Sequence, residues 1–569
     1  MTIRNPILTG FNPDPSIVRV GDDYYIATST FEWYPGVQIH HSRDLVHWRL
    51  LTRPLNRAGQ LNLLGNPDSC GVWAPCLTHA DGLFWLIYTD VKRFGRTSVG
   101  GASGASMRDF HNYLVTSPSI DGDWSDPVHL NSSGFDPSLF HDDDNCKYLV
   151  NMLWDHRPGN NRFAGIVLQQ YSVAQRGLVG ERKNIFTGTP LGFTEAPHLY
   201  KRNGWYYLLT AEGGTAWGHA VTMARSRNLT GPYELHPDIS IMSARHRPDS
   251  ELQRAGHADL VETQNGETYL VYLCGRPLRN RGRCTLGRET AIQKMVWGAD
   301  GWLRTLDGQG IPTLETPAPG LPGFPLTRPS DTLSPTGGEE DVHGKSKAFC
   351  RYDFNSPQLP IDFQWLRTPW PEEIFSLTDR PGFLRLHGRE TIGSVFRQSL
   401  VARRQQSHCF SAATAVEFEP EHFQHLAGLV CYYNHTKFHY LYISHDEALG
   451  KHLRVMSSLP DSPQADAFTP PIAIPAGKPV HLRVEVDYER LHFAYRVDGA
   501  DNDWRWLPQQ FDASILSDEA NTPGLPNFTG AFVGLACQDL AGTLKPADFD
   551  FFEYQERNFR AKLFPASSG

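Results

Sequence analysis

Residues 11–30 read FNPDPSIVRVGDDYYIATST, and this segment indicates the architecture because its pattern recurs four more times along the chain. It places an acidic residue before a proline, then a short apolar strand, a polar turn and an aromatic strand. The five copies align as Asp14-Pro15-Ser16-Ile17, Ala74-Pro75-Cys76-Leu77, Asp136-Pro137-Ser138-Leu139, Ala196-Pro197-His198-Leu199 and His257-Ala258-Asp259-Leu260. Counted from Pro15 to Pro75, Pro137, Pro197 and Ala258, successive copies lie 60, 62, 60 and 61 residues apart.

This period is typical of one architecture. A repeat of about 60 residues with several short strands per copy matches the blades of a β-propeller with somewhat long loops. The 50 glycines and 41 prolines also favour turn-rich β structure. We therefore predict a five-bladed propeller over residues 1–315, in which the first strand of each copy is the innermost strand. A sandwich or jelly roll is the alternative, but it does not require five copies in phase.

The rest of the chain follows a different pattern. Residues 316–348 are rich in proline and glycine and carry no apolar periodicity, which indicates a linker. From residue 349 onward apolar residues alternate with polar ones, as in Leu482, Val484 and Val486. A period of two over many segments predicts a concanavalin-like β-sandwich over residues 349–569. The fold class is thus all-β, with two β domains in series.

The composition of the chain argues against some classes of binding partner and indicates a cellular compartment. A net charge of −9 with a pI near 6.2 lacks the basic footprint of a nucleic-acid or anionic-membrane binder. No run of 18 apolar residues is present, so no membrane span is expected. The N-terminus lacks the apolar core of a signal peptide, and the nine cysteines are scattered without a CxxC pair. We expect reduced thiols and a cytoplasmic location.

Acidic residues occupy matching positions in the copies. Asp14, Asp136 and His257 share the aligned register, and Glu195 stands one residue before it. Because the innermost strands of a propeller surround its axis, three carboxylates and an imidazole should meet in one funnel. Carboxylates held close raise at least one pKa, and one protonated beside one ionised carboxyl is what glycosidic bond hydrolysis requires.

Each residue also has a purely structural interpretation. An Asp before Pro is a common turn device, and a lone His is more often structural than functional. The matched register of three acids favours function. The aromatic residues Phe31, Trp33, Trp73 and Trp154 could supply a face for a sugar ring, and Trp73 and Trp154 could equally belong to the core.

Several motifs carry a family resemblance. They are NPDPS (12–16), GVWAP (71–75), FDPSLF (135–140), TEAPHLY (194–200), AEGGT (211–215), AGHADL (255–260) and GRET (287–290). Together they resemble the signature of glycoside hydrolase family 43, and closely its two-domain β-xylosidases, over nearly the whole chain. The resemblance implies a five-bladed propeller and hydrolysis with inversion at the anomeric carbon.

The resemblance also implies roles for single residues. Asp14 would be the general base, Glu195 the general acid, and Asp136 the residue that tunes and orients the acid. Arg288 would contact the substrate beside the carboxylates. Phe528, in the second domain, would insert into the mouth of the site and close it into a pocket. No cofactor is required; some members hold calcium near the residue that His257 matches.

The expected function is an exo-acting, inverting β-1,4-xylosidase that releases D-xylose from the non-reducing ends of xylo-oligosaccharides. The alternatives are an α-L-arabinofuranosidase, alone or as a second activity, and a non-catalytic sugar-binding propeller whose acids only hydrogen-bond hydroxyl groups. Related enzymes form dimers or tetramers, so a homo-oligomer is expected, with the sandwich as a plausible interface.

Overall fold

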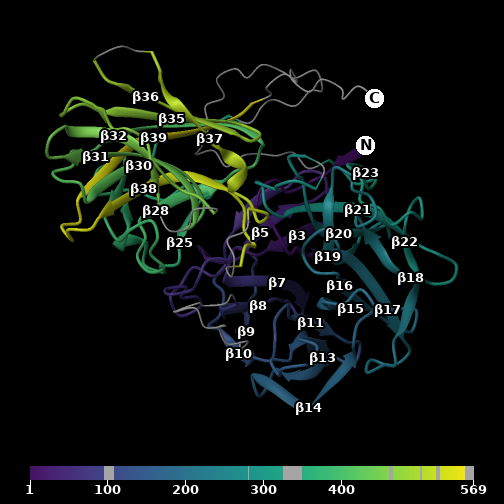
Figure 1. The fold of residues 1–569 in the computed structure, drawn as a ribbon. Helices are drawn as coiled ribbons and strands as arrows, with labels where there is room; N and C mark the ends of the chain where they lie inside the picture. The colour runs from purple at the N-terminus through teal and green to yellow at the C-terminus, as the bar shows by residue number, and fades with distance from the viewer. Residues whose placement is uncertain are drawn as a thin grey trace, which may run out of the picture.

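A computed structural model describes residues 1–94, 108–279, 281–323, 349–460, 466–499, 503–520 and 526–557 of the chain. In these residues the chain forms β-strands and two short 3-10 helices, η1 (Pro371–Glu373) and η2 (Ala513–Ile515). Figure 1 shows two β bodies packed against each other, a propeller built from the first half of the chain and a sandwich built from the second. In the described ranges no helix has both the length and the apolar character to cross a membrane.

The propeller has five blades of four antiparallel strands, and the four strands of each blade come from one sequence copy. From the innermost strand outward they are β2 (Ser16–Val20), β3 (Asp23–Thr28), β5 (Gln38–Ser42) and β6 (Arg49–Thr52); β7 (Gly71–Ala80), β8 (Leu83–Arg93), β9 (Asp109–Ser117) and β10 (Val128–Asn131); β11 (Ser138–His141), β12 (Lys147–Trp154), β13 (Phe163–Ser172) and β14 (Gly177–Phe186); β15 (Glu195–Arg202), β16 (Trp205–Glu212), β17 (Ala220–Ser226) and β18 (Glu234–Ser243); and β19 (Gln253–Glu262), β20 (Thr268–Gly275), β21 (Glu289–Trp297) and β22 (Leu303–Thr305). The predicted five-bladed propeller is confirmed, with the repeated segment as the innermost strand of each blade.

The N-terminal segment closes the ring by running along the fifth blade. Strand β1 (Thr2–Arg4) pairs with β23 (Glu315–Pro317), and the amides of Ile7 and Leu8 donate to the Thr290 carbonyl on β21. The Asn12 amide then donates to the Arg288 carbonyl at 2.9 Å. Closure therefore brings the start of the first copy beside the GRET motif, which is far away in the sequence.

The second domain is a sandwich of two sheets. One sheet has the order β26 (Phe375–Ser376), β27 (Leu384–His387), β39 (Pro546–Glu556), β29 (Cys409–Glu417), β35 (Val480–Asp487), β36 (Arg490–Val497) and β37 (Arg505–Asp512), with β24 (Phe349–Tyr352) also on β39. The other has the order β33 (Ala467–Phe468), β32 (Gly450–Ser458), β31 (Lys437–Asp446), β30 (His425–Asn434), β38 (Phe532–Asp539), β28 (Leu400–Arg404), β25 (Phe363–Leu366) and β4 (Trp33–Tyr34), with β34 (Ile472–Ala473) also on β32.

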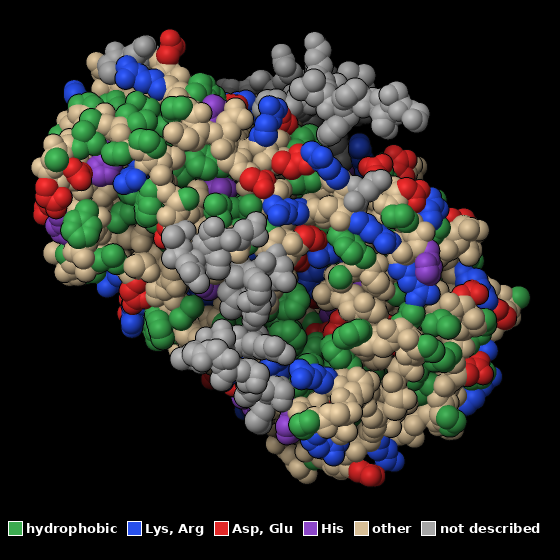
Figure 2. All heavy atoms as spheres, in the orientation of Figure 1, with side chains coloured by type: hydrophobic (Ala, Val, Ile, Leu, Met, Phe, Trp, Pro, Cys, Tyr) green, Lys and Arg blue, Asp and Glu red, His purple; other side chains and the backbone are tan. Residues whose placement is uncertain are grey.

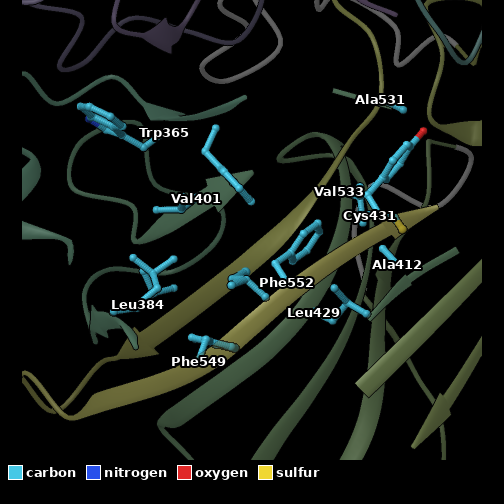
Figure 3. Packing of buried hydrophobic residues seen from close by; sticks show 14 of the residues in the cluster. Trp365, Leu384, Val401, Ala412, Leu429, Cys431, Ala531, Val533, Phe549 and Phe552 are labelled. Carbon is cyan, nitrogen blue, oxygen red and sulfur yellow. The ribbon is translucent and has the colours of Figure 1, made fainter. Parts of the chain in front are cut away.

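The core of the sandwich lies between these sheets. Figure 3 shows Phe549 and Phe552 of β39 in the same cluster as Leu429 of β30 and Val533 of β38, and all four are fully buried. Along β35, Leu482, Val484 and Val486 are buried while the residues between them are partly exposed, as the period of two in the sequence predicts.

The two domains share a β-sheet and are not simply two separate units in series. Strand β4 comes from the first sequence copy, yet it pairs with β25 as the edge of a sandwich sheet, Trp33 opposite Leu366. The Trp33 ring stacks on Phe532 with centroids 3.8 Å apart. Residues 324–348 of the predicted linker and residues 558–569 of the predicted sandwich lie outside the described part of the chain.

Candidate active site

One backbone feature repeats at the inner end of every blade. The aligned residues of the five copies all have positive φ, and they are Asp14 (56°), Ala74 (41°), Asp136 (53°), Ala196 (49°) and His257 (43°). Residues other than glycine rarely adopt this left-handed conformation, and such strain persists where the surrounding structure enforces it. The chain bends at this point in each blade. Asp14, Asp136 and His257 at the bend, together with Trp73 and Glu195 one residue before it, line one cavity.

Asp14 is held by donors on both carboxylate oxygens. The Arg288 guanidinium donates to Oδ1 at 2.6 Å, and the Ser29 hydroxyl donates to Oδ2 at 2.7 Å. The Ser29 oxygen in turn accepts the Ala74 amide at 2.7 Å, which fixes the hydroxyl between the first two blades. A cation and a hydroxyl in contact stabilise the ionised carboxylate and hold it in one orientation.

Glu195 and Asp136 lie in a different electrostatic environment. Burial, with a further contribution from the charge of Asp14, raises the pKa of Glu195 to about 8, and Arg288 opposes part of this rise. Burial and the charges of Glu195 and Asp14 raise the pKa of Asp136 well above its usual range. The site therefore combines an ionised carboxylate at Asp14 with a carboxyl at Glu195 that keeps its proton at neutral pH.

His257 lies between two of the acids. Its Nδ1 is 3.8 Å from Asp14 Oδ1 and 3.9 Å from Asp136 Oδ2. Burial lowers the pKa of His257 to about 4, so the ring is neutral at pH 7. Within the described residues, no three His, Cys, Asp or Glu side chains are grouped so as to hold a metal ion. Calcium near His257 remains a prediction.

These groups line a cavity of about 280 Å³. Its walls also contain Phe31, Trp73, Phe94, Phe135, Phe163, Phe193, Gly214, Thr215 and Phe528. In Figure 2 the surface is hollowed over the middle of the propeller, where acidic side chains lie beneath hydrophobic ones. A small cavity with an aromatic wall and convergent charged groups fits one or two sugar rings.

The sandwich completes the cavity through Phe528. Its ring lies edge-on to Trp73 and to Phe94, with centroids 5.6 Å apart in each pair. Its backbone carbonyl accepts a hydrogen bond from Arg288 at 2.9 Å, and its amide donates to the Ser69 hydroxyl at 3.1 Å. Arg288 thus contacts both the carboxylate of Asp14 and the loop that carries Phe528.

The structure also locates the aromatic residues considered from the sequence. Phe31 and Trp73 line the cavity, whereas Trp154 packs behind it against Phe163, with centroids 5.6 Å apart. Trp33 is fully buried at the domain junction.

Four lining phenylalanines were missed by the sequence reasoning: Phe94, Phe135, Phe163 and Phe193. Phe135 had a usable signal, because it precedes Asp136 as Trp73 precedes Ala74 and Glu195 precedes Ala196. Phe94 directly follows β8 and Phe163 begins β13, and no repeated register marks either residue.

Family models match both domains of the chain. The model for glycosyl hydrolases family 43 matches residues 3–303. The model for the β-xylosidase C-terminal concanavalin A-like domain matches residues 351–555. Both matches fall on the units that the strands define.

Known proteins are similar over nearly the whole length. The chain is 50% identical over 557 residues to Xylosidase/arabinosidase 43B of Humicola insolens, covering 97% of each chain. It is 49% identical over 568 residues to Beta-xylosidase of Bacillus subtilis, covering 98% of this chain and 100% of that one. The solved structure of xylan beta-1,4-xylosidase from Bacillus halodurans C-125 is 50% identical, with a TM-score of 0.90 over 97% of this chain and 100% of that chain.

Proposed function

Because the chain belongs to glycosyl hydrolases family 43, we propose that it is an exo-acting, inverting β-1,4-xylosidase that removes D-xylose from the non-reducing ends of xylo-oligosaccharides. The observation that carries the proposal is the pairing, around one cavity, of an ionised carboxylate fixed by Arg288 with a carboxyl protonated at neutral pH. Glycoside hydrolysis needs this combination.

Each acid then has one task. Glu195 donates its proton to the glycosidic oxygen as the bond from that oxygen to the anomeric carbon breaks. Asp14 accepts a proton from the water molecule that attacks the anomeric carbon from the opposite face, so the configuration inverts. Asp136, whose own pKa is raised by burial and by the neighbouring acids, orients Glu195 and tunes its pKa. Solvent then takes the proton from Asp14 and returns one to Glu195. For inversion, the carboxyl groups of Asp14 and Glu195 are expected to lie about 6.5–9.5 Å apart.

The shape of the cavity supports exo action. Phe528 reaches from the sandwich to the cavity wall and narrows the site, whereas an endo-acting enzyme needs a groove open at both ends. The neutral imidazole of His257 and the guanidinium of Arg288 supply donors for ring hydroxyl groups, and Phe31 and Trp73 supply apolar surface for the ring. A pocket of this kind takes one chain end.

Arabinofuranosidase activity is the second candidate, since the name of the Humicola insolens relative includes both activities. We propose xylosidase activity as the main one. The test compares kcat/KM on xylobiose and 4-nitrophenyl β-D-xyloside with kcat/KM on 4-nitrophenyl α-L-arabinofuranoside. A higher value on the arabinofuranoside would replace the first assignment with the second. No turnover of any of the three would favour a sugar-binding propeller.

Two further proposals concern the whole molecule. All nine cysteines are free, which supports a cytoplasmic location. Large apolar side chains are exposed at one end of the sandwich, at Phe423, Leu540 and Leu544, which supports a homo-oligomer that buries this domain. Light scattering coupled to size-exclusion chromatography tests the second: a monomer mass at micromolar concentration would refute it.

A further inference from the structure

A second cavity, of about 270 Å³, lies where the propeller meets the sandwich. Three parts of the chain line it: the N-terminal segment with Asn12, the first blade with Gln38, His40 and Arg53, and the sandwich with Asp362, Arg403 and Arg404. None of these residues lines the active-site cavity. The lining is mainly polar, and its character is set by three arginines.

The positive charge of the three arginines exceeds the negative charge of the other residues that line the cavity. Arg53, Arg403 and Arg404 are all more than nine-tenths buried. Asp362 is the one acidic residue of the described chain that lines the cavity, and its Oδ2 already accepts the Tyr352 hydroxyl at 2.5 Å. With His40 neutral, since burial and the two nearby arginines lower its pKa to about 3, the lining has a net charge of about +2.

The hydrogen bonds of Arg53 and Arg404 run to neutral acceptors. Arg53 donates to the Ile361 carbonyl at 2.5 Å and to Gln38 Oε1 at 2.6 Å. Arg404 donates to the Phe11 carbonyl at 2.6 Å and to the side chain of Gln364. These bonds hold both guanidinium groups in place without neutralising them.

Polar atoms on the same residues also lack partners. Within the described residues, Arg53 Nε, Arg403 Nε, Arg404 Nη2 and His40 Nδ1 are buried and form no hydrogen bond. Leaving a buried charged donor unsatisfied is costly, so such atoms call for a partner beyond the protein groups present.

The burial of these side chains also lowers the pKa values of two of the arginines. Burial lowers the pKa of Arg53 to about 9. Burial and the charge of Arg53 lower the pKa of Arg404 far below its usual range. A negatively charged ligand between the two would reduce their mutual repulsion and restore the hydrogen bonds that water gave them.

We propose that this cavity binds a small oxyanion, of the phosphate, sulfate or carboxylate class, that bridges the propeller and the sandwich through Arg53 and Arg404. A planar guanidinium group can donate two parallel hydrogen bonds to two oxygens of such an anion. The two arginines come from different domains and would bind the anion from two sides. Asn12 accepts a hydrogen bond from the side-chain amide of Gln38 at 2.7 Å. The side chain of Gln38, on the first blade, is therefore held in place without the anion.

The consequence is stabilisation of the assembled two-domain fold. An anion that binds only when both domains are in place adds to the free energy of unfolding by mass action. The proposal does not depend on the reaction that the active site performs.

The test measures the melting temperature of the full-length protein in rising concentrations of sodium phosphate, sodium sulfate and sodium acetate, each against sodium chloride of equal ionic strength. We expect a saturable rise of about 1–3 °C at ten times the dissociation constant of the anion that fits. The three salts distinguish tetrahedral oxyanions from carboxylates. A rise that grows linearly without saturation would reflect general salt effects and would overturn the proposal.

Variants assign the effect to the cavity. Arg404→Gln should abolish the saturable rise, and Arg53→Gln should weaken the apparent affinity at least about tenfold, because each removes one charged partner. The matched control is Arg247→Gln, which removes an exposed arginine paired with Asp249 in a separate basic cleft. The control should respond like the wild type. An equal response in all three variants would refute the assignment.

A second measurement uses the wild type alone, in case a variant fails to fold. Crystals soaked in sodium selenate should show anomalous density between Arg53 and Arg404. A water molecule there at every selenate concentration, or selenate bound only elsewhere, would overturn the proposal.

Discussion

The proton on Glu195 sets the sharpest prediction of the proposed mechanism. With a pKa of about 8, roughly nine-tenths of the Glu195 carboxyl is protonated at pH 7 and about one-tenth at pH 9. For xylobiose, whose leaving group needs the proton, kcat/KM should therefore fall about tenfold between pH 7 and pH 9.

The perturbation is Glu195→Ala. On xylobiose the variant should lose about 10²- to 10⁴-fold in kcat/KM, the usual contribution of a general acid, and the basic limb of its pH profile should disappear. On an aryl xyloside with a nitrophenolate leaving group, which departs without protonation, the loss should be far smaller.

The assay is release of xylose from xylobiose and of nitrophenolate from the aryl xyloside, between pH 5 and pH 9. Glu234→Gln, an exposed acid on the same blade, serves as the control and should keep the basic limb. Equal losses on both substrates, or a basic limb that survives in Glu195→Ala, would refute the assignment of Glu195 as the acid.

Three further predictions concern the same cavity. Asp14→Asn should lower kcat by about 10²- to 10⁴-fold on xylobiose and on the aryl xyloside alike, since water activation is needed for any leaving group; selective loss on one would contradict the base assignment. Phe528→Ala removes two edge-on aromatic contacts of about 0.5–1.5 kcal/mol each and should lower kcat/KM about tenfold, whereas Phe528→Leu should lower it less. Equal activity of the wild type and Phe528→Ala would show that Phe528 does not contribute to substrate binding. The raised pKa of Glu195 means that the folded state holds this proton more tightly than the unfolded state, so its contribution to stability is lost as pH rises from about 4.5 to about 8. The melting temperature of Glu195→Gln relative to wild type should therefore increase by several °C across this range, and a constant difference would contradict the raised pKa.

The repeat explains why so much of the site could be predicted. Five copies in phase mean five inner strands with one register, so Asp14, Asp136 and His257 had to reach the same axis once the blades closed. Glu195 belongs to the site for the same reason, one residue earlier, because the chain bends at the following residue. No contact had to be known for this inference.

Other parts of the site depend on contacts between distant segments. Arg288 reaches Asp14 because the N-terminal segment closes the ring along β21, and Phe528 reaches Trp73 because the sandwich packs on the propeller. The resemblance to a family supplied these two residues; periodicity could not, since neither lies in a repeated register.

The pairing of β4 with β25 had no sequence signal at all. A two-residue strand within the first copy looks like part of a loop, and only the sandwich edge beside it makes it a strand. Phe94 and Phe163 were missed for a similar reason, since Phe94 directly follows β8 and Phe163 begins β13, outside the repeated register.

In the proposed mechanism Asp14 activates water while Glu195 protonates the leaving oxygen, and the stereochemistry of the product distinguishes this mechanism from direct attack by Asp14. Proton NMR spectra recorded in the first minutes of xylobiose hydrolysis, before mutarotation, should show α-xylose as the first sugar released from the non-reducing end. If β-xylose formed first, the configuration would be retained, and Asp14 would have to attack the anomeric carbon itself.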